Sequence, residues 1–395
     1  MTTRSSRRHT GAWLAVTMGL GIALAFLSGT AQAQRDEPVK LGVLLALTGG
    51  SGQLGQMMLQ GSALAADEIN EAGGIRGRPL ELVPEDSRGL ARQGLDGLRK
   101  LIDVDRVQVA ITGWTPVVVA VAPVAERREV YLISASTATP AVRGLSPYFQ
   151  SAWMYDDASV KALLPYAKEH LDVQRLGLFT IQNDLGLALA PPIKQAWDSM
   201  GGELVAEESH QAAETNFRPS LMRMLHRNPD AIFVTSSVGH QAAQIIRQAR
   251  ELGYQGLFLS NGYIEAPEVM GLGSRADGTY YNSADYDPSG DRELTATFAR
   301  NFRDRHDRLP NIHEANHYDL VYMYKKAAEA LIDEGKPVTG ASVREYFVNN
   351  MPTYEGAAGD YAFNFEDGSV VRSMVVKTFK DGEAVIVKAL EATDL

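Results

Sequence analysis

LTGGSGQLGQMMLQG, residues 47–61, stands between an apolar run and a segment with helical periodicity. Gly50, Gly52 and Gly55 within it have the G-x-G-x-x-G spacing of the turn that joins a strand to a helix in dinucleotide-binding folds. We therefore predict a strand, a tight turn and a helix here. Whether the turn holds a cofactor depends on the residues that follow it.

The acidic partner of the dinucleotide motif is missing from its usual place. Such a site needs an acid about 20 residues beyond the glycines to hold the ribose hydroxyls. The second predicted strand instead ends at Glu85 and Asp86, displaced by the long turn AGGIRGRP at 72–79. We therefore predict no cofactor, and interpret the glycine turn with Ser51 as a place where a ligand approaches the amides at a helix N-terminus.

Short apolar strands and amphipathic helices alternate along the chain. The first set has predicted strands at 39–47, 80–84, 107–112 and 130–134, with helices at 56–70, 91–102 and 118–126. The second set has strands at 176–182, 204–209, 231–235 and 257–260, with helices at 159–170, 187–200, 217–226 and 240–252. A later helix reaches residue 331. Buried runs that alternate with helices indicate parallel strands in an α/β fold.

Composition and the N-terminal segment narrow the class of protein. The 395 residues include no cysteine, which excludes disulfides, thiolate metal sites and a cysteine nucleophile, and the formal net charge is −10. Acids and bases are interspersed, so we predict no nucleic-acid partner. Residues 1–33 have arginines, an apolar stretch and an AQA cleavage pattern at 31–33, which predict a secretory signal peptide. After cleavage we expect a periplasmic protein that is not embedded in the membrane, with about two domains.

Two groups of ionisable residues could in principle form a metal site or an acid/base pair, but we favour a structural role for both. His313 and His317, with Glu314 between them, match the H-E-x-x-H motif of zinc metallopeptidases, which we keep as a remote alternative. No third histidine follows at the usual spacing, so we favour a polar helix start and predict no metal site. The adjacent acids Asp156 and Asp157 are interpreted as solvated loop charges.

Longer stretches are similar to a known family. GQLGQMMLQGSALAADEINEAGGIRGRPLELVPEDSRG, at 52–89, resembles the N-terminal signature of periplasmic binding proteins of the leucine/isoleucine/valine-binding family. Further matching segments follow in the family's order over nearly the whole remaining chain. They are ITG at 111–113, VAPVAE at 121–126, LISASTATP at 132–140, QIIRQARELG at 244–253 and HYDLVYMYKKA at 317–327.

The resemblance implies a type I periplasmic binding fold, an α/β fold with two Rossmann-like lobes whose parallel-rich sheets are joined by a three-crossover hinge. The crossovers are expected near Trp153, Ser283 and Arg372. Lobe 1 is then 38–153 plus 284–371, and lobe 2 is 154–283 plus 372–395. The lobes would close on a small-molecule ligand, and an ABC permease with its ATPase would recognise the closed form. The family is not enzymatic and needs no cofactor.

The resemblance also points to the residues that hold the ligand. In the family, the loop after the fourth strand binds a carboxylate, and here we favour Ser136 and Thr137, with Thr139 as the alternate. Helix N-terminal amides and short hydroxyl groups suit an anion in any case. The alternative is that these hydroxyls only cap a helix. After the third strand, Thr115 would add a hydroxyl and Trp114 would either floor the pocket or pack between helices.

The second lobe departs from the family's pattern. The acid that anchors an α-ammonium group falls near Asn261, with Glu265 further on, and Asp184 is another candidate for this role. A buried ammonium without a carboxylate partner is costly, so we predict a carboxylate-bearing ligand that need not be an amino acid. The expected aromatic walls of the pocket are Trp153, Tyr155 and Tyr263. The alternatives are a branched-chain or other amino acid, or a sensor that presents its closed form to a signalling protein.

Overall fold

The structure is a computed structural model that describes Met1 and residues 37–211, 213–235 and 239–390. Apart from Met1, the predicted signal peptide lies outside the described residues. None of the helices in the described ranges is long and apolar enough to cross a membrane. The predicted α/β class is confirmed, since parallel-rich sheets alternate with helices along most of the chain.

A five-stranded parallel sheet forms the centre of the first lobe, in the order β2-β1-β3-β4-β5. Its strands are β1 (Val39–Leu45), β2 (Leu80–Asp86), β3 (Val109–Thr112), β4 (Tyr131–Ser134) and β5 (Phe149–Ser151). The connecting helices are α2 (Gly52–Glu71), α3 (Ala91–Asp103) and α4 (Thr115–Arg127), with the short 3-10 turn η1 (Pro140–Val142). The carboxyl ends of parallel strands meet at one edge, where ligand-binding loops commonly gather.

A seven-stranded sheet forms the second lobe, in the order β15-β14-β10-β9-β8-β6-β7. Its strands are β6 (Arg175–Ile181), β7 (Glu203–His210), β8 (Ala231–Val234), β9 (Leu257–Ser260), β10 (Thr279–Ala284), β14 (Met374–Lys380) and β15 (Glu383–Leu390). The helical segments are α5 (Asp156–His170), α6 (Asp184–Ser199), α7 (Arg218–Leu225), α8 (Gly239–Glu251), η2 (Gly262–Ile264), α9 (Pro267–Met270) and η3 (Gly273–Ala276). Strand β14 pairs antiparallel with β10, and β15 pairs antiparallel with β14.

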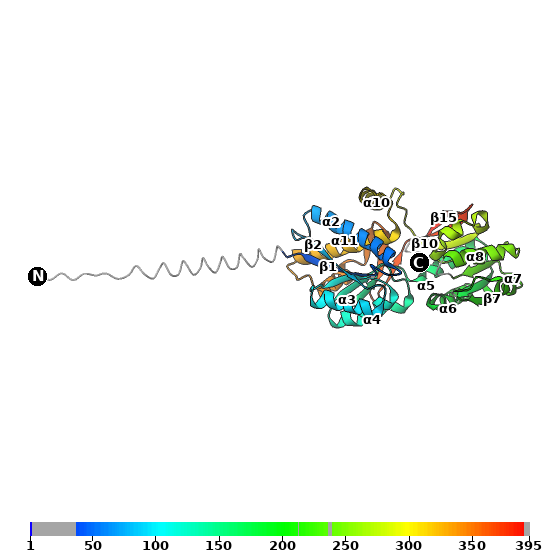
Figure 1. Ribbon diagram of the computed structural model, residues 1–395, viewed down its shortest axis with the longest axis horizontal. Helices are drawn as coiled ribbons and strands as arrows, with labels where there is room; N and C mark the ends of the chain where they lie inside the picture. The colour runs from blue at the N-terminus through cyan, green and yellow to red at the C-terminus, as the bar shows by residue number, and fades with distance from the viewer. Residues whose placement is uncertain (2–36, 212, 236–238, 391–395) are drawn as a thin grey trace.

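The chain returns to the first lobe between β10 and β14. This segment contains α10 (Glu293–His306), α11 (Ile312–Asp333), α12 (Gly340–Asn350) and the antiparallel strands β11 (Thr353–Gly356), β12 (Gly359–Asn364) and β13 (Ser369–Arg372). Figure 1 shows α2 and α11 on one side of the first sheet and α3 and α4 on the other. The main core of this lobe combines β1, β3 and β4 with α2 and α11, so it joins residues far apart in sequence.

Three connections join the two lobes, because the chain passes between their sheets after β5, after β10 and after β13. The predicted three-crossover arrangement is therefore confirmed. The crossover after β13 is a single residue, Ser373, between β13 and β14. Short links of this kind hold the facing edges of the lobes close together.

The glycine turn at 47–61 has a structural explanation that needs no nucleotide. Helix α2 begins at Gly52, earlier than predicted, and a Cβ atom on Gly55 would overlap the carbonyl oxygen of Ala46 in the strand below. The carboxylate of Asp86 accepts the backbone N–H of Leu47 at 2.9 Å. The acid at the end of the second strand therefore holds this loop in place.

Candidate ligand-binding cleft

A cavity of about 970 Å³ lies where the two lobes face each other. The first lobe contributes residues of α2, the start of α4, the loop after β4 and the start of α11 to its walls. The second lobe contributes residues of α5, α6, η2, β10 and β14. The volume is that of a typical small-molecule site. A ligand in this cavity would therefore contact both lobes at once.

One wall of the cavity carries hydrogen-bond donors. Thr115 and Ser136 both line it, and the Ser136 hydroxyl is buried without a hydrogen-bond partner among the described residues. Thr115 is the first residue of α4. Pro116 after it has no N–H, and the N–H groups of Val117 and Val118 donate to the carbonyl of Trp114 at 3.0 and 2.9 Å, so this turn offers a ligand the hydroxyl and N–H of Thr115. Trp114 precedes it with a φ of 64°, a conformation that is strained for a bulky residue and is typical of functional sites.

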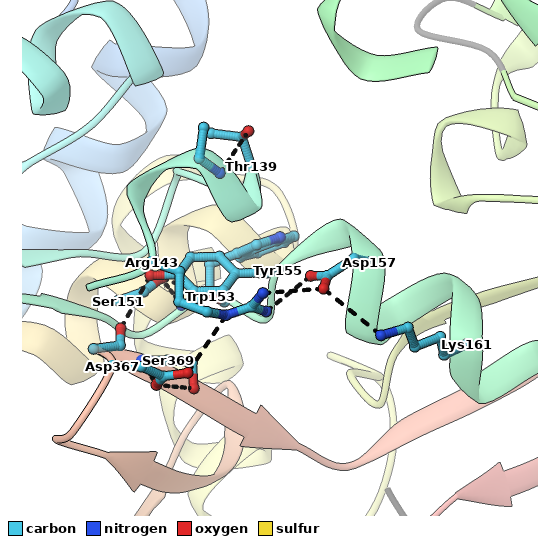
Figure 2. Close-up of polar contacts among 11 residues, drawn as sticks. Thr139, Arg143, Ser151, Trp153, Tyr155, Asp157, Lys161, Asp367 and Ser369 are labelled. Carbon is cyan, nitrogen blue, oxygen red and sulfur yellow. Dashed lines mark hydrogen bonds and ion pairs between the residues drawn. The ribbon is translucent and has the colours of Figure 1, made fainter. Parts of the chain in front are cut away.

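The other predicted hydroxyls differ in position. Thr139 lines the cavity and accepts the N–H of Ala141 at 3.3 Å, so it also caps η1 (Figure 2). Thr137 is 1% exposed and its hydroxyl lies 3.0 Å from that of Ser134, beneath the loop and outside the cavity lining. Ser51 is the N-cap residue of α2 and is likewise outside the lining. Ser136 is therefore the hydroxyl of the 134–139 loop that is best placed to donate to a ligand.

The first crossover places aromatic rings on two different surfaces. Trp153 lines the cavity and stacks on His313, with ring centroids 5.2 Å apart and planes 10° apart. Tyr155 turns away from the cavity, and its hydroxyl donates to the carbonyl of Gly368 at 3.1 Å. The guanidinium of Arg143 lies over the ring of Tyr155, as Figure 2 shows. Tyr155 thus ties the crossover to the small antiparallel sheet.

The two adjacent acids after this crossover are buried differently from the sequence expectation. Arg143 donates to both carboxylate oxygens of Asp157, at 3.1 and 2.9 Å (Figure 2). Asp156 lines the cavity, and burial together with the charge of Asp157 raises its pKa to about 7. Their interpretation as solvated loop charges is therefore wrong. Adjacency in sequence gave no sign that one acid would be paired and the other would face the cleft.

Tyr263 and Glu265 of the second lobe line the cavity. Both are predicted from the sequence to contact the ligand. The carboxylate of Glu265 pairs with Lys377 of β14 at 3.0 Å, a partner that the sequence did not suggest. Asn261 is 2% exposed and lies outside the cavity lining. Asp184 begins α6, and its side chain lies outside what the structure describes.

The H-E-x-x-H segment is a helix start. Asn311 caps α11 in a capping box, and the carboxylate of Glu314 accepts the N–H of Asn311 at 2.7 Å and pairs with Arg308. The Nδ1 atom of His317 is 2.9 Å from the carbonyl oxygen of His313, and burial lowers the pKa of His313 to about 4. No group of three potential metal ligands gathers within the described parts of the chain. The favoured interpretation as a helix start is confirmed, and nothing here supports the zinc alternative.

The chain is similar in sequence to the proteins of one known family. A family model described as periplasmic binding protein matches residues 38–384. An amino acid binding protein of Pseudomonas aeruginosa is 24% identical over 247 residues, which are 62% of this chain and 64% of that protein. The chain therefore matches slightly less than two thirds of that relative's length.

Two solved structures match over a longer range. An ABC transporter substrate-binding protein from Sphaerobacter thermophilus is 25% identical with a TM-score of 0.77, covering 91% of this chain and 99% of the other. A solute-binding protein from Rhodopseudomonas palustris, solved with 3,4-dihydroxy benzoic acid, is 22% identical with a TM-score of 0.71, covering 90% and 98%. The shared fold thus includes both lobes.

Proposed function

The chain belongs to the periplasmic binding protein family, and from this premise we propose that it captures a small carboxylate-bearing solute between its lobes and delivers it to an ABC importer. The observation that carries this proposal is the cavity of about 970 Å³ with walls from both lobes. We further propose the predicted lobes, 38–153 plus 284–371 and 154–283 plus 372–395, as the moving parts, and the periplasm as the location.

Ligand capture would work through the hinge. A ligand that contacts both lobes binds the closed form more tightly than the open form, so it shifts the population towards closure. The three short crossovers restrict the lobes to a hinge motion. A permease that recognises only the closed form would then receive loaded protein in preference to empty protein.

A carboxylate suits the donor wall of the cavity. The hydroxyl of Ser136, which has no partner among the described residues, and the hydroxyl and N–H of Thr115 at the start of α4 offer donors on one wall. Helix N-termini and hydroxyl groups stabilise anions through directed hydrogen bonds and the helix dipole. These groups bind and orient a ligand. They do not form the nucleophile and base pair that hydrolysis needs.

The first test is thermal unfolding of the chain without residues 1–33, in the presence of single amino acids and amine-free carboxylates. A ligand at about 100 times its Kd adds about 2.7 kcal/mol to stability, which raises the unfolding midpoint by a few degrees. We expect at least one carboxylate to do this, and its methyl ester or amide to have no effect. Ser136→Ala should reduce the shift. If no carboxylate of either class changes the midpoint, the proposal fails.

A further inference from the structure

His313 is an imidazole in the cleft whose ring has no polar partner among the described residues. It lines the cavity at the second residue of α11. Its Nδ1 atom is buried without a hydrogen-bond partner. The Nε2 atom has no hydrogen bond to the described parts of the chain either, but it is not one of the buried unpartnered atoms. Nε2 is therefore the ring nitrogen that a ligand can reach.

The His313 ring is held in place from two directions. Its face lies against Trp153, with the ring planes only 10° from parallel. Its backbone N–H donates to the side-chain oxygen of the helix cap Asn311 at 2.9 Å. A ring that is fixed in this way offers a hydrogen bond of defined direction to a ligand.

The His313 ring is neutral and has one N–H group. Burial lowers its pKa to about 4, so near pH 7 only one of its two nitrogens carries a proton. A buried N–H without an acceptor is costly, and Nδ1 has no acceptor, so the proton is more stable on Nε2. A neutral N–H that faces a cavity suits an uncharged oxygen of a ligand.

The position of His313 relative to the donor wall follows from the first sheet. Strands β4 and β5 are neighbours, with Ser134 paired to Ser151 at their carboxyl ends. Ser136 lies two residues beyond the one strand and Trp153 two residues beyond the other, and both line the cavity. His313 stacks on Trp153. A solute whose carboxylate is held at Ser136 would therefore pass Trp153 before it reaches His313 with a group at its other end.

We propose that His313 donates a hydrogen bond to a hydroxyl group at the far end of the solute, so that the cleft selects hydroxylated aromatic carboxylates. Trp114, Trp153 and Met58 give the lining flat and apolar surface, which suits a ring as the body of the solute. A compound without the hydroxyl would leave the imidazole N–H unpaired on closure, and this cost produces the selectivity. This inference rests on the proposed function and restricts it.

The test compares matched pairs of compounds by isothermal titration calorimetry. The pairs are benzoate with 3- and 4-hydroxybenzoate, 3-phenylpropionate with 3-(4-hydroxyphenyl)propionate, and phenylalanine with tyrosine. The last pair makes the result independent of an amino group on the solute.

Three proteins are compared, each without residues 1–33. They are the unaltered chain, His313→Phe and the control His170→Phe. Phenylalanine at 313 keeps a ring that can stack on Trp153 but has no N–H. His170 is an exposed histidine at the end of α5 that stacks on Tyr166, with ring centroids 4.9 Å apart, and it lies outside the cavity lining.

We expect a hydroxylated compound to bind the unaltered chain about tenfold more tightly than its partner without the hydroxyl. His313→Phe should lose this preference and keep its affinity for the partner compound, while His170→Phe matches the unaltered chain. The inference is overturned if the members of each pair bind equally, or if the preference survives in His313→Phe. It is also overturned if none of these compounds binds while another carboxylate raises the unfolding midpoint. In these cases the proposed function stands, whereas failure of every carboxylate removes both.

Discussion

Asp156 and Asp157 are neighbours in sequence, yet their carboxylates meet opposite environments. Asp157 is held by two hydrogen bonds from Arg143, whereas Asp156 faces the cleft with its pKa raised to about 7. The sequence predicted Ser136 and Thr137, with Thr139 as the alternate, as ligand-binding hydroxyls, and it missed Asp156; Ser136, Thr139 and Asp156 line the cavity. The burial of an acid depends on the segments that pack around it, here the loop at 134–139 of the first lobe and η2 of the second.

The raised pKa of Asp156 gives the free protein a specific pH dependence. The carboxyl group of Asp156 ionises at about pH 4 in the unfolded chain. The folded state therefore favours its neutral form between that pH and about 7. Its contribution to stability is therefore present at low pH and is lost as the pH rises through about 7. Replacing the acid by a neutral amide removes this loss.

Asp156→Asn should accordingly raise the free energy of unfolding at about pH 8 by about 1–3 kcal/mol, allowing for screening by water in the cleft. The difference should shrink towards zero near about pH 4. Urea unfolding of the ligand-free protein at the two pH values measures this difference in free energy. The control is Asp198→Asn, which removes an exposed acid of α6. If Asp156→Asn is less stable than the unaltered chain at about pH 8, the pKa of Asp156 is not raised in the folded protein.

The helices and parallel strands were predicted well where the pattern is local. The predicted strand at 257–260 and the helix at 91–102 agree with β9 and α3 to within a residue. The antiparallel strands of the last third were not predicted. Strands β11 and β13 have four residues each, too few for a period to stand out, and β14 pairs with the distant strand β10, which the local pattern does not reveal.

Close packing of α2 on α11 leads to a prediction at the scale of elements. A Cβ atom on Gly61 would overlap the backbone carbonyl of Glu314, so these helices can approach only with glycine at this position. Gly61→Ala should lower the free energy of unfolding by about 1–3 kcal/mol or more, because neither backbone can move aside easily.

Gly50→Ala is the matched control, because nothing lies within 4 Å of a Cβ atom built there. Chemical denaturation of both variants without ligand gives the comparison. Equal stability of Gly61→Ala and Gly50→Ala would show that the two helices have room to separate.

At the scale of the whole molecule, the signature at 52–89 and the further matching segments along the chain predicted the fold, and the family match over 38–384 confirms the resemblance. The cleft was harder to predict, because its lining comes from segments between Leu54 and Lys377 and from both lobes. A shift of one or two positions in each loop is enough to move a residue such as Thr137 out of the lining.

Hinge closure predicts a distance change that can be measured directly. The chain has no cysteine, so Val119→Cys in α4 and Leu187→Cys in α6 provide two unique labelling sites, both exposed. These residues lie near the helix starts that line the cleft from opposite lobes. A spin-label distance measurement should give a shorter and narrower distribution once the ligand is added. An unchanged distribution at saturating ligand would argue against closure.

The three crossovers also determine when the polypeptide can finish folding. The main core of the first lobe needs residues before 153 together with residues from 298 to 370, and the cores of the second lobe include Val376 and Phe379. The cluster on the other face of the first sheet, between Leu44 and Tyr155, is complete early. The main core of the first lobe and the cores of the second lobe are complete only when almost all of the 395 residues have left the ribosome. At about 5–20 residues per second, synthesis lasts roughly 20–80 s. During that time these cores lack the C-terminal residues that complete them.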